Sequence, residues 1–216
     1  MLSKDWIEKW ARKYDERHQE EVELEGAIST EIKEIGSPPT YLTLAILEKI
    51  AVWKVAEWRA QRIKGYIGKN KDKDVIDITQ VALTTHNERL RLEALRILNG
   101  VNVRMASSIL WFCFPDKYSV MDRYAWKTLQ IHRLIDGEMK DTFECYRYYN
   151  KVCGDIVESL KHFGITRRKL DKALWQFGCE KCEFSNEKVV LLFDSKDWSN
   201  YKQYQCQKCG FIWGES

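Results

Sequence analysis

The sequence has no long hydrophobic segment and little net charge. None of its apolar stretches approaches the roughly 18 residues of a membrane-spanning helix, and its first residues lack the hydrophobic run of a signal peptide. We therefore expect a soluble, cytoplasmic protein that has no membrane partner. The formal net charge of +3 is far from the strongly basic balance of many DNA-binding modules. This charge neither supports nor excludes nucleic acid as a partner, because a local basic patch is enough for binding.

Repeats and histidine ligand patterns are also missing. No internal similarity recurs at solenoid periods, and the four histidines show no ligand spacing among themselves. What the chain does have is apolar content: 44% of its 216 residues are hydrophobic and nine are tryptophan, which is sufficient for a real core. The length suits one domain and a small appendage, and we expect a monomer.

Apolar residues at helical spacing predict an all-α fold through residue 178. Residues 1–35 are expected to be helical, with a second segment over 20–35, and further helices are expected over 41–63, 74–84, 90–98, 103–114, 122–131, 143–162 and 167–177. Residues 1–36 form an N-terminal packing arm whose first helix is capped by Ser3. Thr40 and Thr166 are expected to cap later helices, a loop is expected over 65–73, and Gly178 is expected to end the last helix.

The C-terminal segment, residues 179–216, has a different character. Cys179-x-x-Cys182 and Cys206-x-x-Cys209 supply two pairs of thiols at the spacing of two metal-binding knuckles, and residues 189–193 and 201–205 have strand patterns. Four thiolates in this arrangement predict a zinc ribbon, since so small a module needs a metal to fold. Rubredoxin-type iron and two disulfides are the alternatives. The other thiols, at positions 113, 145 and 153, are expected to be core residues.

Residues 90–126 organise the chain. Asn99-Gly100 ends one apolar helix, and a second apolar helix begins near Val103, so the two form a hairpin whose backbone amides lie at a helix N-terminus. Such amides bind phosphate. We therefore predict a phosphate-binding site at the hairpin residues Asn99, Gly100, Val101, Asn102, Val103 and Arg104.

This segment resembles the helix–hairpin–helix DNA glycosylases, the relatives of endonuclease III. The resemblance rests on Leu98-Asn99-Gly100-Val101-Asn102, on Ala106 and on Val120-Met121-Asp122-Arg123, and it extends over roughly residues 40–178. The family hairpin reads Leu-Pro-Gly-Val-Gly. In the family, the catalytic aspartate follows the lysine position by 18 residues, which is the separation of Arg104 and Asp122 here. Here Asn99 stands in place of the proline, and Asn102 in place of the second glycine, where asparagine tolerates a positive φ. The resemblance implies a two-lobed, glycosylase-like helical domain.

By this resemblance, Asp122 is the catalytic carboxylate, which stabilises a cationic sugar or positions water as the glycosidic bond breaks. The alternative role is a helix N-cap, and the two roles are compatible. Arg104 occupies the position of the Schiff-base lysine of bifunctional members. A guanidinium stays protonated, so amine-driven strand cleavage is not expected from it. Lys54, on an otherwise apolar segment, is either a snorkelling side chain or a lysine supplied to the site from another helix.

The sequence therefore predicts a DNA-binding protein of the base-excision type, a monofunctional N-glycosylase that flips a modified base out of the duplex. A non-catalytic nucleic-acid-binding module is the alternative, with the hairpin for phosphates and the ribbon for a partner. A protein-interaction role of the ribbon, with the helices as a scaffold, is a third.

Overall fold

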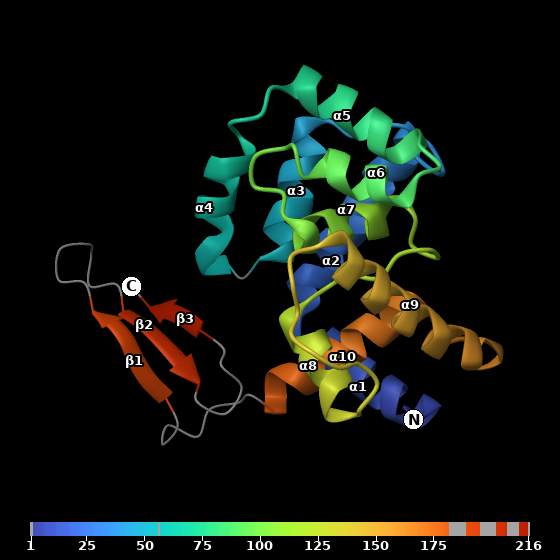
Figure 1. Ribbon diagram of the computed structural model, residues 1–216, viewed down its shortest axis with the longest axis vertical. Helices are drawn as coiled ribbons and strands as arrows, with labels where there is room; N and C mark the ends of the chain where they lie inside the picture. Colours follow the sequence, from blue (N-terminus) through green and yellow to red (C-terminus); the bar gives the residue numbers. More distant parts are fainter. Residues whose placement is uncertain (1, 56, 182–188, 195–201, 207–211, 216) are drawn as a thin grey trace.

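The computed structural model describes residues 2–55, 57–181, 189–194, 202–206 and 212–215. The described residues through 181 form helices, and the short segments beyond them form strands (Figure 1). In chain order the elements are α1 (Lys4–Arg17), α2 (Gln19–Ile35), α3 (Leu44–Lys54), α4 (Glu57–Ile67), α5 (Asp72–Thr84), α6 (Glu88–Leu95), α7 (Val103–Cys113), α8 (Arg123–Ile131), α9 (Phe143–Ser159), the 3-10 helix η1 (Lys161–Phe163), α10 (Arg167–Lys181), β1 (Val189–Asp194), β2 (Lys202–Cys206) and β3 (Ile212–Glu215). The predicted all-α class is confirmed for this described part of residues 1–178.

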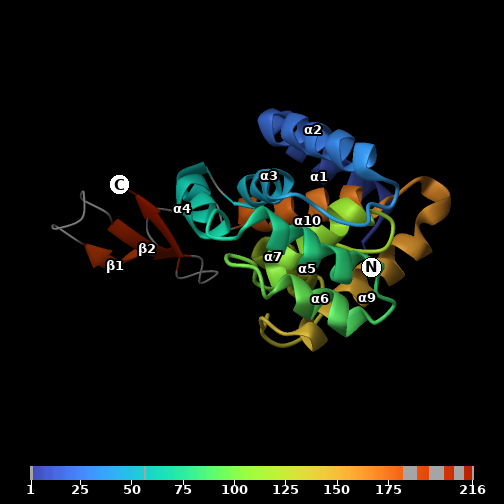
Figure 2. The same cartoon turned by 90° about the horizontal axis from the view of Figure 1, so that it is seen from above.

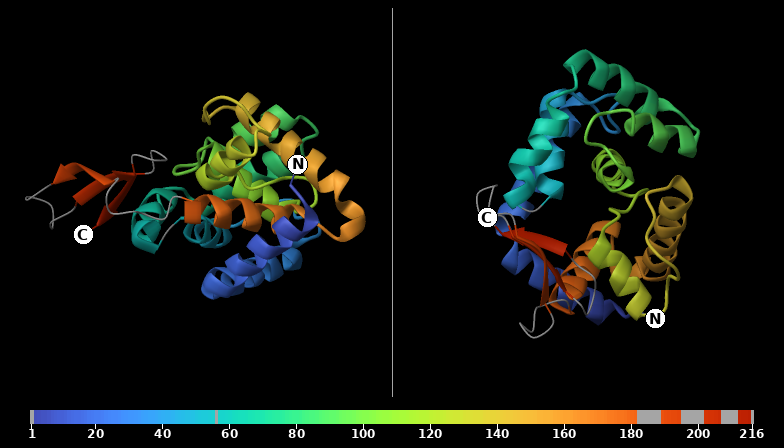
Figure 3. Two further views of the ribbon diagram at one scale, coloured as in Figure 1. Left: turned by 90° about the horizontal axis from the view of Figure 1, so that it is seen from below. Right: turned by 60° about the vertical axis from the view of Figure 1, so that its left-hand side comes forward.

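The helices form two groups. The middle of the chain, α3 to α7, makes one group, whereas α8, α9 and α10 form the other together with α1 (Figure 1). Helix α2 contacts both groups. Helix α10 lies between α1 and α8, as the views in Figures 2 and 3 show. Among the described residues, no helix combines the length and the apolar character that crossing a membrane requires.

The N-terminal arm packs against the last helix. The side chain of Ser3 accepts a hydrogen bond from the N–H of Trp6, which confirms the predicted cap of α1. The rings of Trp6 and Trp10 each lie 5.2 Å from the ring of Phe177 on α10. The first described helix therefore completes the core around the last one.

The predicted helix over residues 41–63 is wrong in its extent. It begins later, because the Thr43 side chain accepts a hydrogen bond from the N–H of Ile46, so Thr43 and not Thr40 is the cap. It also stops early: Val55 has an extended backbone (φ −108°, ψ 153°), and the chain restarts as α4, which packs against α3. The loop predicted over 65–73 is shorter than expected, since α4 runs to Ile67 and α5 begins at Asp72.

Gly178 does not end α10, contrary to the prediction. The helix continues through it to Lys181, so Cys179 is helical. A Cβ atom on Gly178 would collide with the carbonyl oxygen of Tyr124 and lie 2.7 Å from Oγ1 of Thr128, both on α8. The glycine is therefore required by the close crossing of α8 and α10, because only a residue without a side chain fits between the two backbones.

The three strands form one antiparallel sheet in the order β1-β2-β3. The two strands predicted at 189–193 and 201–205 correspond to β1 and β2, and the pairing places Val189 opposite Cys206. The predicted turn at residues 198–200 lies outside the described residues.

Candidate functional site

The stretch that leads into Asp122 is held in place from three helices. The N–H of Met121 donates to Oγ of Ser107 on α7, at 2.8 Å, and the Ser107 hydroxyl donates to the carbonyl of Arg104 at 2.6 Å. The first turn of the hairpin's second helix is therefore tied directly to the residue before Asp122. Further bonds come from α9 and α10: Tyr146 Oη to Ser119 O (3.2 Å), Tyr149 Oη to Val120 O (3.0 Å) and Arg167 Nη1 to Ser119 Oγ (2.8 Å).

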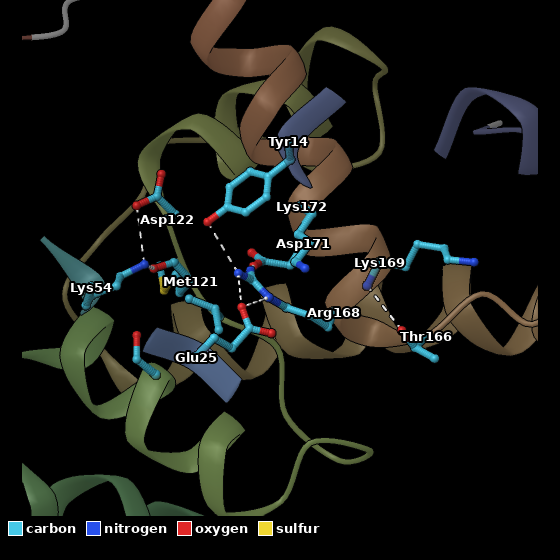
Figure 4. Close-up of polar contacts among 12 residues, drawn as sticks. Tyr14, Glu25, Lys54, Met121, Asp122, Thr166, Arg168, Lys169, Asp171 and Lys172 are labelled. Carbon is cyan, nitrogen blue, oxygen red and sulfur yellow. Dashed lines mark hydrogen bonds and ion pairs between the residues drawn. The ribbon is translucent and has the colours of Figure 1, made fainter. Parts of the chain in front are cut away.

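Asp122 is a helix N-cap, as one of its two predicted roles requires, and it also forms an ion pair. Its Oδ1 accepts a hydrogen bond from the N–H of Tyr124 at 2.8 Å, so it caps α8. Its Oδ2 lies 3.3 Å from Nζ of Lys54, with which it forms an ion pair (Figure 4). The side chain of Asp122 is 20% exposed and that of Lys54 is 11% exposed. The pair is thus largely withdrawn from water, where an electrostatic interaction is stronger than at the surface.

Lys54 reaches this site from the other group of helices. It is the last residue of α3, and its Nζ also donates to the carbonyl of Met121 at 3.2 Å. The ammonium group lies against the segment between α7 and α8 and does not extend to solvent as a snorkelling lysine does. The Lys54–Asp122 pair therefore joins the two groups of helices at one point.

A second buried charged cluster lies next to this pair. Arg168 on α10 donates to Oε2 of Glu25 from Nη2 at 2.6 Å and also contacts Asp171 and the hydroxyl of Tyr14 (Figure 4). Burial raises the pKa of Asp171, and its Oδ1 atom has no hydrogen-bond partner among the described residues. Burial likewise raises the pKa of Tyr14, to about 12.

The charges of these two clusters do not balance. Lys54 and Arg168 supply two positive charges, whereas Asp122, Asp171 and Glu25 supply three carboxylates. The guanidinium of Arg168 also lies over the rings of Trp53 and Trp111, at 5.0 and 5.3 Å from their centroids. An excess of carboxylates beside buried aromatic rings favours a positive charge, either a proton on Asp171 or a cation that develops nearby.

The hairpin has the predicted turn. Gly100 has φ +82°, a value that favours glycine, and α7 begins at Val103. The expectation that Asn102 adopts a positive φ is wrong: its φ is −94°, and its side chain caps α7 by accepting from the N–H of Met105 at 2.9 Å. Asparagine stands here as a helix cap and not as a glycine substitute.

The six hairpin residues differ in whether their amides are available to a ligand. The backbone N–H groups of Gly100, Asn102 and Arg104 have no hydrogen bond within the described part of the chain. The N–H of Val101 is bonded to Leu98 O at 3.1 Å, and that of Val103 to Oδ1 of Asp141 at 3.0 Å. Three amides of the predicted phosphate site are therefore available, and an aspartate already occupies a fourth.

Asn99, which stands where the glycosylase hairpin has proline, has a structural role that the sequence did not reveal. Its backbone N–H donates to Oδ1 of Asn70 at 2.9 Å, and Asn70 Nδ2 donates back to Asn99 O at 3.1 Å. A proline lacks the N–H that this exchange needs. The pair fixes the hairpin to the end of α4, so the Asn99 amide is not available to DNA.

The four predicted zinc ligands are only partly described. Cys179 lies near the end of α10 and Cys206 is the last residue of β2, whereas Cys182 and Cys209 lie outside the described residues. Of the remaining thiols, Cys113 and Cys153 are buried, as predicted for core residues, whereas Cys145 is only partly buried at the edge of the core. Burial raises the pKa of Cys153 to about 12, so it is not a thiolate at neutral pH.

A groove of about 520 Å³ lies between α1 and α10 and not beside Asp122. Its lining includes Arg12 and Asp15 from α1 and Lys169 and Lys172 from α10. Neither Asp122 nor Lys54 lines this groove.

Compared with protein-family models, with curated proteins and with solved structures, the chain gives no significant match.

Proposed function

We propose that this protein binds DNA through the hairpin of residues 99–104 and acts as a monofunctional N-glycosylase, with Asp122 as its catalytic carboxylate. The observation that carries the proposal is the position of Asp122: it is four-fifths covered, it lies where the two helix groups meet, and Ser107 ties its segment to the hairpin helix. In this proposal the two helix groups are the lobes of a glycosylase-like domain, and residues 179–216 are a zinc ribbon.

The chemistry required of these residues is limited. The bond between C1′ of the sugar and the nitrogen of the base breaks, and both electrons leave with the base, which takes up a proton. A water molecule adds its oxygen to C1′ and releases its own proton, which leaves an abasic strand. The carboxylate of Asp122 stabilises the positive charge that develops on the sugar. Three available hairpin amides hold a phosphate of the same strand.

A screen of oligonucleotides tests this function. Duplexes that each carry one modified base are incubated with the protein, and abasic sites are detected by strand cleavage after alkali is added. Excision of at least one base supports the proposal. Binding of duplexes without excision of any base supports the second function below.

The second function is a non-catalytic nucleic-acid-binding module. It is favoured by one observation: both carboxylate oxygens of Asp122 already have hydrogen-bond partners. Oδ1 accepts from the N–H of Tyr124, and Oδ2 accepts from Nζ of Lys54. For catalysis, Lys54 has to move or share the carboxylate as the sugar arrives. In a binding module the same pair serves only to join the two helix groups.

Borohydride is expected to trap no covalent adduct between the protein and DNA from which it has excised a base. Arg104 cannot form a Schiff base because its guanidinium stays protonated, and the Lys54 side chain is held by hydrogen bonds to Asp122 and to the Met121 carbonyl. The measurement is denaturing electrophoresis of labelled DNA after borohydride treatment. An adduct that disappears in Lys54→Gln but persists in Lys127→Gln would show instead that Lys54 is a nucleophile.

The purified protein is expected to contain about one zinc ion per chain, held by Cys179, Cys182, Cys206 and Cys209, because four thiolates in two knuckles suit tetrahedral zinc. Cys206→Ser should lose the metal and keep the helical circular dichroism of residues 2–181, since Cys206 lies in β2. Elemental analysis measures the zinc content of both proteins, and circular dichroism measures their helix content. Cys145→Ser, a thiol outside the two knuckles, is the control that should keep its zinc. A protein without zinc, or with an iron chromophore, would contradict the prediction.

A further inference from the structure

The end of α4 carries an exposed tyrosine between two cations. The side chain of Tyr66 is 42% exposed, the guanidinium carbon of Arg62 lies 5.9 Å from its ring centroid, and Nζ of Lys69 lies 5.2 Å from it. A hydrogen bond from Arg62 lowers the pKa of the Tyr66 hydroxyl. A solvent-facing ring flanked by positive charges is the combination that binds unpaired nucleotides, because bases stack on the ring and phosphates contact the cations.

This tyrosine stands directly against the hairpin. A Cβ atom at Gly100 would lie 3.2 Å from Cβ of Tyr66 and 3.0 Å from Cδ1 of Ile67, which is fully buried. Three residues after Ile67, the reciprocal hydrogen bonds between Asn70 and Asn99 hold the same two segments together. The ring and the available amides of Gly100 and Asn102 are therefore parts of one rigid surface.

The cations near Tyr66 are not neutralised by acidic partners. Arg62 and Lys69, the two cations that lie against the Tyr66 ring, are both exposed, and within the described residues neither of them forms an ion pair. Lysines elsewhere are often paired: Nζ of Lys49, for example, lies 2.5 Å from Glu31 Oε1. The positive charge beside the hairpin is therefore free to bind the phosphates of a ligand.

We propose that the end of α4 is a second DNA-binding surface, continuous with the hairpin, which recognises an unpaired nucleotide. Tyr66 stacks on the exposed base, and Arg62 and Lys69 bind the phosphates on either side of it. The proposal rests on DNA binding by the hairpin and adds the form of DNA that is preferred: a duplex with one unpaired nucleotide near the phosphate that the hairpin holds.

Fluorescence anisotropy tests this proposal with two labelled duplexes, one fully paired and one with a single unpaired nucleotide. Wild-type protein should prefer the second duplex. Tyr66→Ala should bind it about 10-fold more weakly and the paired duplex nearly as before, because stacking on one base is lost. Tyr66→Phe keeps the ring and should bind like wild type. Tyr148→Ala removes an equally exposed tyrosine on α9 and is the matched control.

The cations are tested by salt dependence. The association constant for DNA falls as salt rises, and each phosphate contact contributes nearly one to the steepness of log K against log salt concentration. Arg62→Gln combined with Lys69→Gln should therefore make this slope shallower by about two. Lys151→Gln combined with Lys161→Gln removes the same charge from two lysines that are paired with acids, and it should leave the slope unchanged. Equal slopes for the two double variants would overturn the role of Arg62 and Lys69.

The failure of this inference is distinguishable from the failure of the proposed function. Gly100→Ile should abolish binding to both duplexes, because isoleucine does not fit at φ +82° against Ile67. If that variant loses binding while Tyr66→Ala binds the unpaired duplex like wild type, only the role of Tyr66 is overturned. If Gly100→Ile binds normally, or wild type binds neither duplex, the hairpin assignment fails and this inference fails with it. Should Gly100→Ile lose its helical circular dichroism, Arg104→Gln replaces it as the hairpin variant.

Discussion

Asp122→Asn is expected to lower the rate of base excision about 100-fold or more while DNA binding is retained, because deletion of one preorganised electrostatic group has effects of this size. Asparagine has nearly the same shape, and its side-chain oxygen can still accept the hydrogen bond from the N–H of Tyr124 that caps α8. The measurement is single-turnover excision on the best substrate of the oligonucleotide screen.

The Lys54 ammonium makes a stability control necessary. Asp122→Asn leaves Lys54 with the carbonyl of Met121 as its hydrogen-bond partner but without its ion-pair partner. Loss of one partner of a fully buried pair costs about 3–5 kcal/mol, and this pair is partly exposed, so the cost should be smaller. Lys54→Met combined with Asp122→Asn should recover stability and remain inactive. Excision by Asp122→Asn at the wild-type rate would contradict a catalytic role for the carboxylate.

Gly178→Ala is expected to lower the free energy of unfolding by about 3 kcal/mol or more, because a methyl group at this position overlaps the carbonyl of Tyr124 and the helices cannot separate without loss of their packing. The matched control is Gly26→Ala in α2, where a Cβ atom meets nothing within 4 Å. That variant should raise stability by roughly 0.5–1 kcal/mol, the difference in helix propensity between the two residues. Urea unfolding of both variants is the measurement. Equal stabilities of the two variants would show that α8 and α10 tolerate a wider spacing.

The helices were predictable where their signals are local. Ser3 and Asp122 cap helices as expected, since an N-cap needs only a side-chain acceptor and an amide two or three residues away. Gly100 was predictable for the same reason, because the positive φ of a turn is a property of the residues within it. The zinc ligands remain a prediction from spacing.

The remaining features depend on partners that are distant in the sequence. Gly178 reads locally as a helix stop, yet it is the contact point with α8. Asn99 reads as a poor replacement for proline, yet it pairs with Asn70. Lys54 is an unusual lysine on an apolar segment, but only the fold shows that it meets Asp122, 68 residues further on. No periodicity or spacing within one segment contains such pairings.

The packing of α1 on α10 has a consequence for how the chain folds as it is synthesised. Nζ of Lys13 lies 2.5 Å from Oε2 of Glu180, a contact between residues 167 positions apart. Helix α1 is therefore synthesised well before α10, the helix against which it packs most extensively. A nascent chain that stops before residue 167 should expose the apolar face of α1, including Trp6 and Trp10, to chaperones. A circular permutant that links the two ends of the helical part and opens at an exposed loop should bring these helices together early and fold faster, since contacts of short sequence separation form sooner.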